Sequence, residues 1–344
     1  MARASSLPDN TVRLRDLVPR SLRERNVTLI VEPFATVAPT PACLRASFDA
    51  GVSQACADVD VLTRPGALRA VAAQVEKDTG LQVSGAYLQS FGATRTLSAL
   101  AGVLRDRWVV LESPAPVPGA SAVELMRDRR EAILRRVVSG CEGASCASTV
   151  SGNLLDILED GSGRVSGREL AVGLIAATTI PGVNEELVAE VREDVLDSTL
   201  TKEHARRLRA LGRSYEGKRP SKQVSASMVA LWADTCPRLR GWDELAKEQD
   251  PILAAFAWVF RGCSLFASVD DVEVSEPLGE RVDALILTGT EDPIVPASLQ
   301  ERWGQAVKAQ GGTTRTLVGA GHFWEDDAVT ATVQRFVSDR LNRP

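Results

Sequence analysis

The sequence predicts an α/β protein in which a helical insertion interrupts a mostly parallel sheet. Short apolar runs rich in β-branched residues recur near both ends of the chain, and helical patterns follow them. Residues of about 120–280 are instead dominated by helical spacing. Three side chains of a chemically reactive type stand just after such apolar runs. Strands that alternate with helices favour a parallel sheet with crossover helices.

The chain is long enough to bury one large core and to carry an inserted cap. Its 344 residues and 44% hydrophobic content are ordinary for a globular protein. We predict a core made of residues 1–119 and 281–344, with a helical cap at 120–280. The net charge of −5 is spread along the chain, which argues against nucleic acid as the main partner. No apolar run reaches the roughly 18 residues that span a bilayer, so we expect no membrane span.

The first part of the predicted core begins with two helices and a strand between them. Residues 12–25 have helical spacing, and residues 26–31 (NVTLIV) form an apolar, β-rich run. Loop-like sequence follows over 36–60. An amphipathic helix over 64–78 then leads into the next predicted strand.

The stretch at 82–100 (QVSGAYLQSFGATRTLSAL) contains the first candidate catalytic residue. An apolar run ends at Ser90, and helical spacing begins at Ala93. A serine on a sharp turn between a strand and a helix is the arrangement of a nucleophile elbow, whose usual signature is G-x-S-x-G. Here Leu88 replaces the first glycine and Gly92 supplies the second, so the motif by itself is weak. Ser90 is the predicted nucleophile.

Three further strands complete the predicted sheet. They are the apolar runs WVVLE at 108–112, ALILTGT at 284–290 and TRTLVG at 314–319. Prolines after the first of these runs mark the exit into the insertion, whose turns are predicted at 161–167 and 212–220. Amphipathic helices are predicted at 297–309 and 326–341.

Asp292 and His322 follow two of these strands, as Ser90 follows its own strand. Since the carboxyl ends of parallel strands face one edge of a sheet, we expect the three side chains to converge there. A serine hydroxyl needs a base within hydrogen-bond reach, and the base needs an acid that orients it. The chain order Ser…Asp…His is that of the α/β-hydrolase fold. The predicted fold class is therefore an α/β-hydrolase fold with an inserted helical cap.

These side chains also have ordinary structural interpretations. Asp292 could cap the turn before Pro293, and His322 could be a loop histidine. We favour the catalytic roles because all three contexts match in one order. His204, the other histidine, lies in the charged run TKEHARRLR, which indicates a solvated helix face.

Several motifs carry a resemblance to a known family. They are YLQSFGATR around Ser90, WVVLESPAP at 108–116, GCEGASC, GTEDPIVP and GAGH. With these motifs the chain resembles the peptidase branch of the α/β hydrolases, which includes prolyl aminopeptidases and secreted tripeptidyl aminopeptidases. The resemblance spans most of residues 27–341 and is loose in the middle third.

The resemblance implies a role for each matched residue. Ser90 would be the nucleophile, Asp292 the orienting acid and His322 the base, and the Phe91 backbone N–H would donate to the oxyanion. It implies a serine exopeptidase that releases residues from the N-termini of peptides. No metal or organic cofactor is expected, and the substrate would be a peptide or a small ester or amide.

The chain departs from that family near its start. The family has an HGGPG-type loop that supplies a second oxyanion donor, and nothing similar occurs in residues 1–9. The family's Asp-x-Arg-Gly turn is replaced by EPFA at 32–35. We therefore expect N-terminal strands to be missing and the natural chain to begin upstream. Two alternatives stay open: a weakly active or inactive homologue that acts as a binding protein, and a hydrolase of small esters or amides.

Six cysteines occur in local pairs: Cys43 with Cys56, Cys141 with Cys146, and Cys236 with Cys263. An even number in such pairs predicts three disulfides, and hence a secreted or periplasmic protein. The alternative is six buried thiols in a cytosolic enzyme. Zinc is disfavoured, because no C-x-x-C pair occurs and the chain has only two histidines. The start MARASSLPDN lacks the apolar core of a secretory signal.

Overall fold

A computed structural model gives the fold of the chain, and it describes residues 70, 73–74, 76–80, 82–90, 93, 104, 107–114, 120–179, 184–215, 235–236, 239–265, 283–290, 292, 294–309, 313–317 and 327–341. The predictions for residues 12–60 lie outside this part of the chain. The helix predicted at 64–78 is confirmed in its second half, where residues 76–79 are helical.

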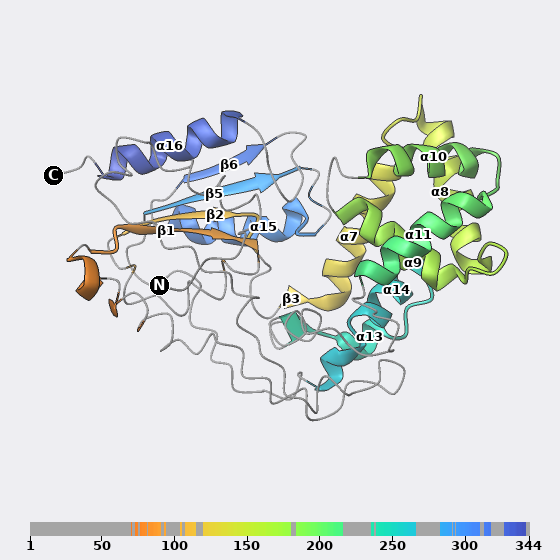
Figure 1. Cartoon of the computed structure of the whole chain (residues 1–344), viewed down its shortest axis with the longest axis horizontal. Helices are drawn as coiled ribbons and strands as arrows, with labels where there is room; N and C mark the ends of the chain where they lie inside the picture. The colour runs from red at the N-terminus through yellow and green to blue at the C-terminus, as the bar shows by residue number, and fades with distance from the viewer. Residues whose placement is uncertain are drawn as a thin grey trace.

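Four parallel strands form the main sheet, in the order β1-β2-β5-β6 (Figure 1). The strands are β1 (Gly85–Gln89), β2 (Trp108–Glu112), β5 (Asp283–Gly289) and β6 (Thr313–Leu317). In register, Gln89 of β1 lies beside Glu112 of β2, which lies beside Leu287 of β5. The chain is thus a mixed protein of helices and small parallel sheets, as the strand–helix alternation predicted.

Two helices cover opposite faces of this sheet, α15 (Ala297–Ala309) and α16 (Asp327–Leu341). Trp303 of α15 packs with Val109 and Leu111 of β2, whereas Phe336 of α16 packs with Val110. Successive side chains of a strand point to opposite faces. Both faces are therefore buried, which explains why these strands read as continuous apolar runs. The bounds predicted for α15 are confirmed.

The described residues between β2 and β5 are mostly helical, as predicted. The elements of this region are β3 (Ala120–Ser121), α7 (Ala122–Val138), α8 (Ala144–Asp160), α9 (Gly167–Thr179), α10 (Glu185–Leu196), α11 (Lys202–Tyr215), β4 (Leu239–Arg240), α13 (Trp242–Leu245), α14 (Pro251–Val259) and the 3-10 helix η2 (Arg261–Leu265). The short parallel pair β3–β4 was not predicted. The turn predicted at 212–220 is wrong at its start, because α11 continues through Gly212.

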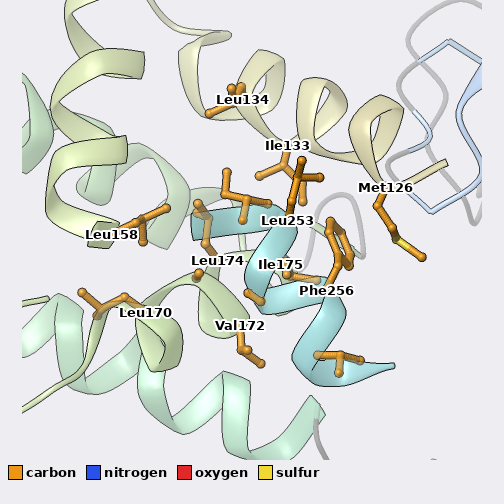
Figure 2. Packing of buried hydrophobic residues seen from close by; sticks show 14 of the residues in the cluster. Met126, Ile133, Leu134, Leu158, Leu170, Val172, Leu174, Ile175, Leu253 and Phe256 are labelled. Atoms are coloured by element: carbon orange, nitrogen blue, oxygen red, sulfur yellow. The ribbon is translucent and has the colours of Figure 1, made fainter. Parts of the chain in front are cut away.

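Helix α14 is the centre of the hydrophobic core of this region. Its sequence, PILAAFAWV, is apolar on nearly every face, which is typical of a buried helix. Figure 2 shows Leu253 and Phe256 of α14 among apolar side chains of α7 and α9. The Asp250 side chain accepts hydrogen bonds from the backbone N–H groups of Ile252 and Leu253, which caps the start of the helix.

Helices α9 and α11 pack backbone to backbone where two glycines meet. A Cβ atom on Gly173 would lie 2.2 Å from the Leu208 carbonyl oxygen, and one on Gly212 would lie 2.9 Å from the Gly173 nitrogen. Real Cβ atoms do not approach other atoms so closely. The close crossing of α9 and α11 therefore depends on these two glycines.

Two of the three predicted disulfides are present in the structure. Cys141 pairs with Cys146 in the segment that joins α7 to α8, and Cys236 pairs with Cys263 of η2. Cys43 and Cys56 lie outside the described residues. Four of the six cysteines are thus bonded in the predicted local pairs, as expected for a protein from an oxidising compartment.

Within the described residues, no helix is both long enough and apolar enough to cross a membrane.

Candidate active site

Ser90 lies directly after β1 in a strained backbone conformation. Its φ angle is +53°, in the left-handed region, and Ala93 is already helical. The left-handed region disfavours residues with a Cβ atom by about 1–2 kcal/mol, so a non-glycine residue there needs support from its surroundings. A left-handed serine between a strand and a helix has the backbone geometry of a nucleophile elbow. The side chain of Ser90 is half-buried.

Leu88 occupies the position of the first glycine in the elbow signature, and it is part of the core. Its side chain is 8% exposed and packs in the cluster that contains Ala93, Leu104 and Trp303. Leu88 therefore contributes to the buried packing on this face of the sheet, which the glycine of the usual signature would not do.

Asp292 lies just beyond the carboxyl end of β5 and is 1% exposed. Its Oδ1 atom accepts hydrogen bonds from the backbone N–H groups of Ile294 (2.8 Å) and Val295 (2.9 Å). The predicted capping role is therefore real. A carboxylate has several acceptor sites, so the same group can hold this turn and orient a second partner.

The order of the strands places these two residues on one edge of the sheet. β1 and β5 are both neighbours of β2, and adjacent strands lie about 4.8 Å apart, so β1 and β5 lie about 10 Å apart. Both strands run in the same direction, so Ser90 and Asp292 follow the same edge. His322 and Phe91 lie outside the described residues. His322 follows β6, the neighbour of β5, by a few positions in the sequence.

Helix α7 contacts the loop that carries Asp292. The buried Arg129 donates a hydrogen bond from Nε to the Ile294 carbonyl, and its guanidinium carbon lies 5.9 Å from the centre of the Phe256 ring. One position earlier, Asp128 accepts a hydrogen bond of 2.5 Å from the Ser298 hydroxyl. Figure 1 shows α7 beside the carboxyl ends of the strands. The helical region is therefore joined to the turn that positions Asp292.

Two polar residues at this edge were not predicted from the sequence. Glu112 ends β2 and is 1% exposed, and the fully buried Ser113 follows it with a φ angle of +42°. Within the described residues, the Ser113 hydroxyl has no hydrogen-bond partner. The signal that singled out Ser90, a serine after an apolar strand, is present at Ser113 too. Arg129 gave no such signal, because arginines are common on helix surfaces.

The prediction of a solvated His204 is wrong. Its Nδ1 atom lies 2.6 Å from Asp194 Oδ2, Nε2 lies 3.5 Å from Glu190 Oε2, and only 18% of the side chain is exposed. Burial by itself would raise the pKa of Asp194, but hydrogen bonds from the Thr201 backbone and from His204 outweigh it and lower that pKa. His204 thus joins α10 to α11, two helices whose charged faces meet.

The described residues contain no group of three or more His, Cys, Asp or Glu side chains that could hold a metal ion. The comparisons leave the family of the chain open. No protein-family model matches it, and a search of curated proteins finds no match.

Proposed function

We propose that this protein is a serine hydrolase of the α/β-hydrolase fold, acting as an exopeptidase on the N-termini of peptides. The left-handed backbone of Ser90 at the end of β1 carries the proposal. Serine has no intrinsic preference for that conformation, and strain of this kind clusters at functional sites. The buried Asp292, two strands away on the same sheet edge, is the second support.

The proposal assigns one role to each of these residues. Ser90 Oγ attacks the carbonyl carbon of the substrate, and His322 takes the hydroxyl proton as the general base. The proposal assigns Oδ2 of Asp292 to accept the other ring N–H of His322, since Oδ1 already holds the turn. The Phe91 backbone N–H donates to the oxyanion. His322 then returns the proton to the leaving amine, and water hydrolyses the acyl-enzyme at Ser90.

The peptide substrate rests on the motifs YLQSFGATR, GTEDPIVP and GAGH, which resemble those of the aminopeptidase branch of the fold. A hydrolase of small esters or amides would use the same side chains, since a fold does not determine its substrate. Leu88 favours a second candidate, a homologue that binds without turnover, because a leucine at the elbow changes the packing next to the nucleophile.

A fluorophosphonate probe tests the nucleophile. The full chain should be labelled at Ser90, and Ser90→Ala should abolish the labelling. Ser113→Ala is the matched control, because Ser113 also follows a strand of this sheet with a positive φ angle but is fully buried. Labelling that survives Ser90→Ala, or folded protein that is not labelled at all, would refute the proposed nucleophile.

Chromogenic peptides then separate the substrate classes. A free N-terminus should be required for rapid hydrolysis, so that N-acetylated versions of the same peptides react slowly. Equal rates for free and acetylated peptides would favour the ester and amide hydrolase. A labelled Ser90 with no turnover of any of these substrates would favour the binding homologue.

A further inference from the structure

A surface cavity of about 190 Å³ lies between α9, α11 and α14, and its walls are strongly cationic. Arg168 comes from the first turn of α9, Arg209 and Arg213 come from α11, and Trp258 comes from α14. Three guanidinium charges and the single carboxylate of Glu169 leave a local charge of +2. None of these residues takes part in the proposed hydrolase chemistry.

Among the described residues that line this cavity, positive charge exceeds negative charge. Arg209 and Arg213 are four positions apart on one face of α11, an arrangement that is unfavourable for like charges. Arg168 lies in the first turn of α9, where the helix dipole disfavours a cation. Glu169 accepts a hydrogen bond of 2.9 Å from Arg209 Nε, and Arg213 Nη2 lies 3.6 Å from the same oxygen.

Glu169 also has a separate structural role. Its Oε2 atom accepts hydrogen bonds from the Ser166 backbone N–H and hydroxyl, while the Ser166 hydroxyl accepts from the Glu169 backbone, which is a capping box. Burial would raise the pKa of Glu169, but hydrogen bonds from the Ser166 backbone and from Arg209 outweigh it and lower that pKa. The carboxylate is therefore ionised at neutral pH and already engaged at both oxygens.

Donors remain available around the cavity. Within the described residues, Arg209 uses only Nε for hydrogen bonding, and the guanidinium of Arg168 makes no hydrogen bond and stacks on Trp258 at 3.8 Å. Arg261 stacks on the same ring at 3.9 Å. Planar guanidinium groups with spare N–H donors match the oxygens of carboxylates and phosphates.

We propose that this cavity binds a small anionic ligand through Arg168, Arg209 and Arg213, with a carboxylate or phosphate group as the recognised part. The cavity volume is smaller than the roughly 300 Å³ at which pockets for drug-sized molecules begin. The ligand is thus a compact anion or the charged end of a longer molecule. Its binding relieves the repulsion between the arginines.

Calorimetric titration of the full chain at low ionic strength tests the proposal, with inorganic phosphate and succinate as the two probes. We expect one saturable site for at least one probe, with affinity that falls as salt is added. Tighter binding of phosphate assigns a phosphoryl ligand, and tighter binding of succinate assigns a carboxylate. The absence of a saturable site for both probes would overturn the proposal.

Variants separate a built site from diffuse surface charge. Arg213→Gln and Arg168→Gln should each weaken binding about ten- to a hundred-fold, which is the loss of one charge-assisted hydrogen bond. Arg206→Gln is the matched control, since Arg206 lies on α11 outside the cavity and should change the affinity less than two-fold. Equal losses in Arg206→Gln and Arg213→Gln would refute the site.

The Glu169→Gln variant should change the affinity for the anion in the opposite direction. Glutamine retains the capping box but removes the competing negative charge, so the anion should bind more tightly, by about ten-fold. A misfolded variant could not produce that gain. Unchanged or weaker binding in a folded Glu169→Gln protein would contradict the proposed role of the three arginines.

Discussion

Replacing Ser90 by glycine should give a more stable protein than replacing it by alanine, and both changes should abolish the proposed reaction. At a φ angle of +53°, a residue with a Cβ atom is disfavoured by about 1–2 kcal/mol, and glycine is not. Glycine in turn loses about 0.5–1 kcal/mol more conformational entropy on folding than alanine. Ser90→Gly should therefore be more stable than Ser90→Ala by about 1 kcal/mol, because both variants lack the hydroxyl and differ only in the Cβ atom.

Calorimetry can resolve this difference. At about 2.1 cal/mol/K for each of the 344 residues, the unfolding entropy is about 0.7 kcal/mol/K, so about 1 kcal/mol corresponds to a Tm difference of about 1.4 °C. Ser198 calibrates the comparison, since its φ angle is +56° and it lies in an exposed turn far from the sheet in sequence. The Tm of Ser198→Gly should exceed that of Ser198→Ala by a similar margin. A Ser90→Gly protein that melts below Ser90→Ala would show that the strand does not end in a strained turn.

Three further predictions concern the attachment of the helical region to the sheet and the packing within that region. Arg129→Met should lower the free energy of unfolding in urea by about 1–3 kcal/mol, since it removes the buried guanidinium that donates to the Ile294 carbonyl, and turnover should fall with it. Gly173→Ala should lower that free energy by about 1–3 kcal/mol, because the added Cβ atom forces α9 away from α11. Replacing Cys236 and Cys263 by serine should lower the free energy of unfolding by about 3.5 kcal/mol, which is the chain-entropy value for a sequence separation of 27.

Each of these predictions has a matched control. Arg127→Met removes an arginine of α7 that is 59% exposed, and it should change stability by less than about 0.5 kcal/mol. Gly152→Ala adds a Cβ atom inside α8 where nothing lies within 4 Å, and it should stabilise by about 0.5–1 kcal/mol. Removing Cys141–Cys146, with a separation of 5, should cost about 2 kcal/mol. A reversed order within any pair would contradict the structural reasoning for that pair.

The main sheet was predictable because its strands are buried on both faces. Continuous apolar runs at 108–112 and 284–290 predict buried strands rather than loops. The bounds of β2 are those predicted. The helix at 297–309 was predictable from its amphipathic spacing, which one buried face produces. The end of α11 was not, because Gly212 looks like a helix stop and is instead the point where α9 approaches most closely.

Some residues of the candidate site were also predictable from the sequence, and others were not. The placement of Ser90 and Asp292 at one edge was predictable because each follows an apolar strand, and parallel strands bring such positions to one edge. Arg129 was missed because its burial depends on Ile294 and Phe256, which are distant in sequence. His204 was misjudged for a related reason. Its charged neighbours suggest a solvated face, and only the packing of α10 against α11 encloses it.

The sequence by itself determined the four strands of the main sheet, the helical character of the segment between them, two local cysteine pairs and the order of the reactive side chains. These follow from periodicity and from short-range spacing, which a single chain displays directly. Only the tertiary structure decided the φ angle of Ser90, the attachment of Arg129 to the Asp292 turn and the arginine-lined cavity. Each of these depends on which distant segments meet, and that is a property of packing rather than of any local pattern.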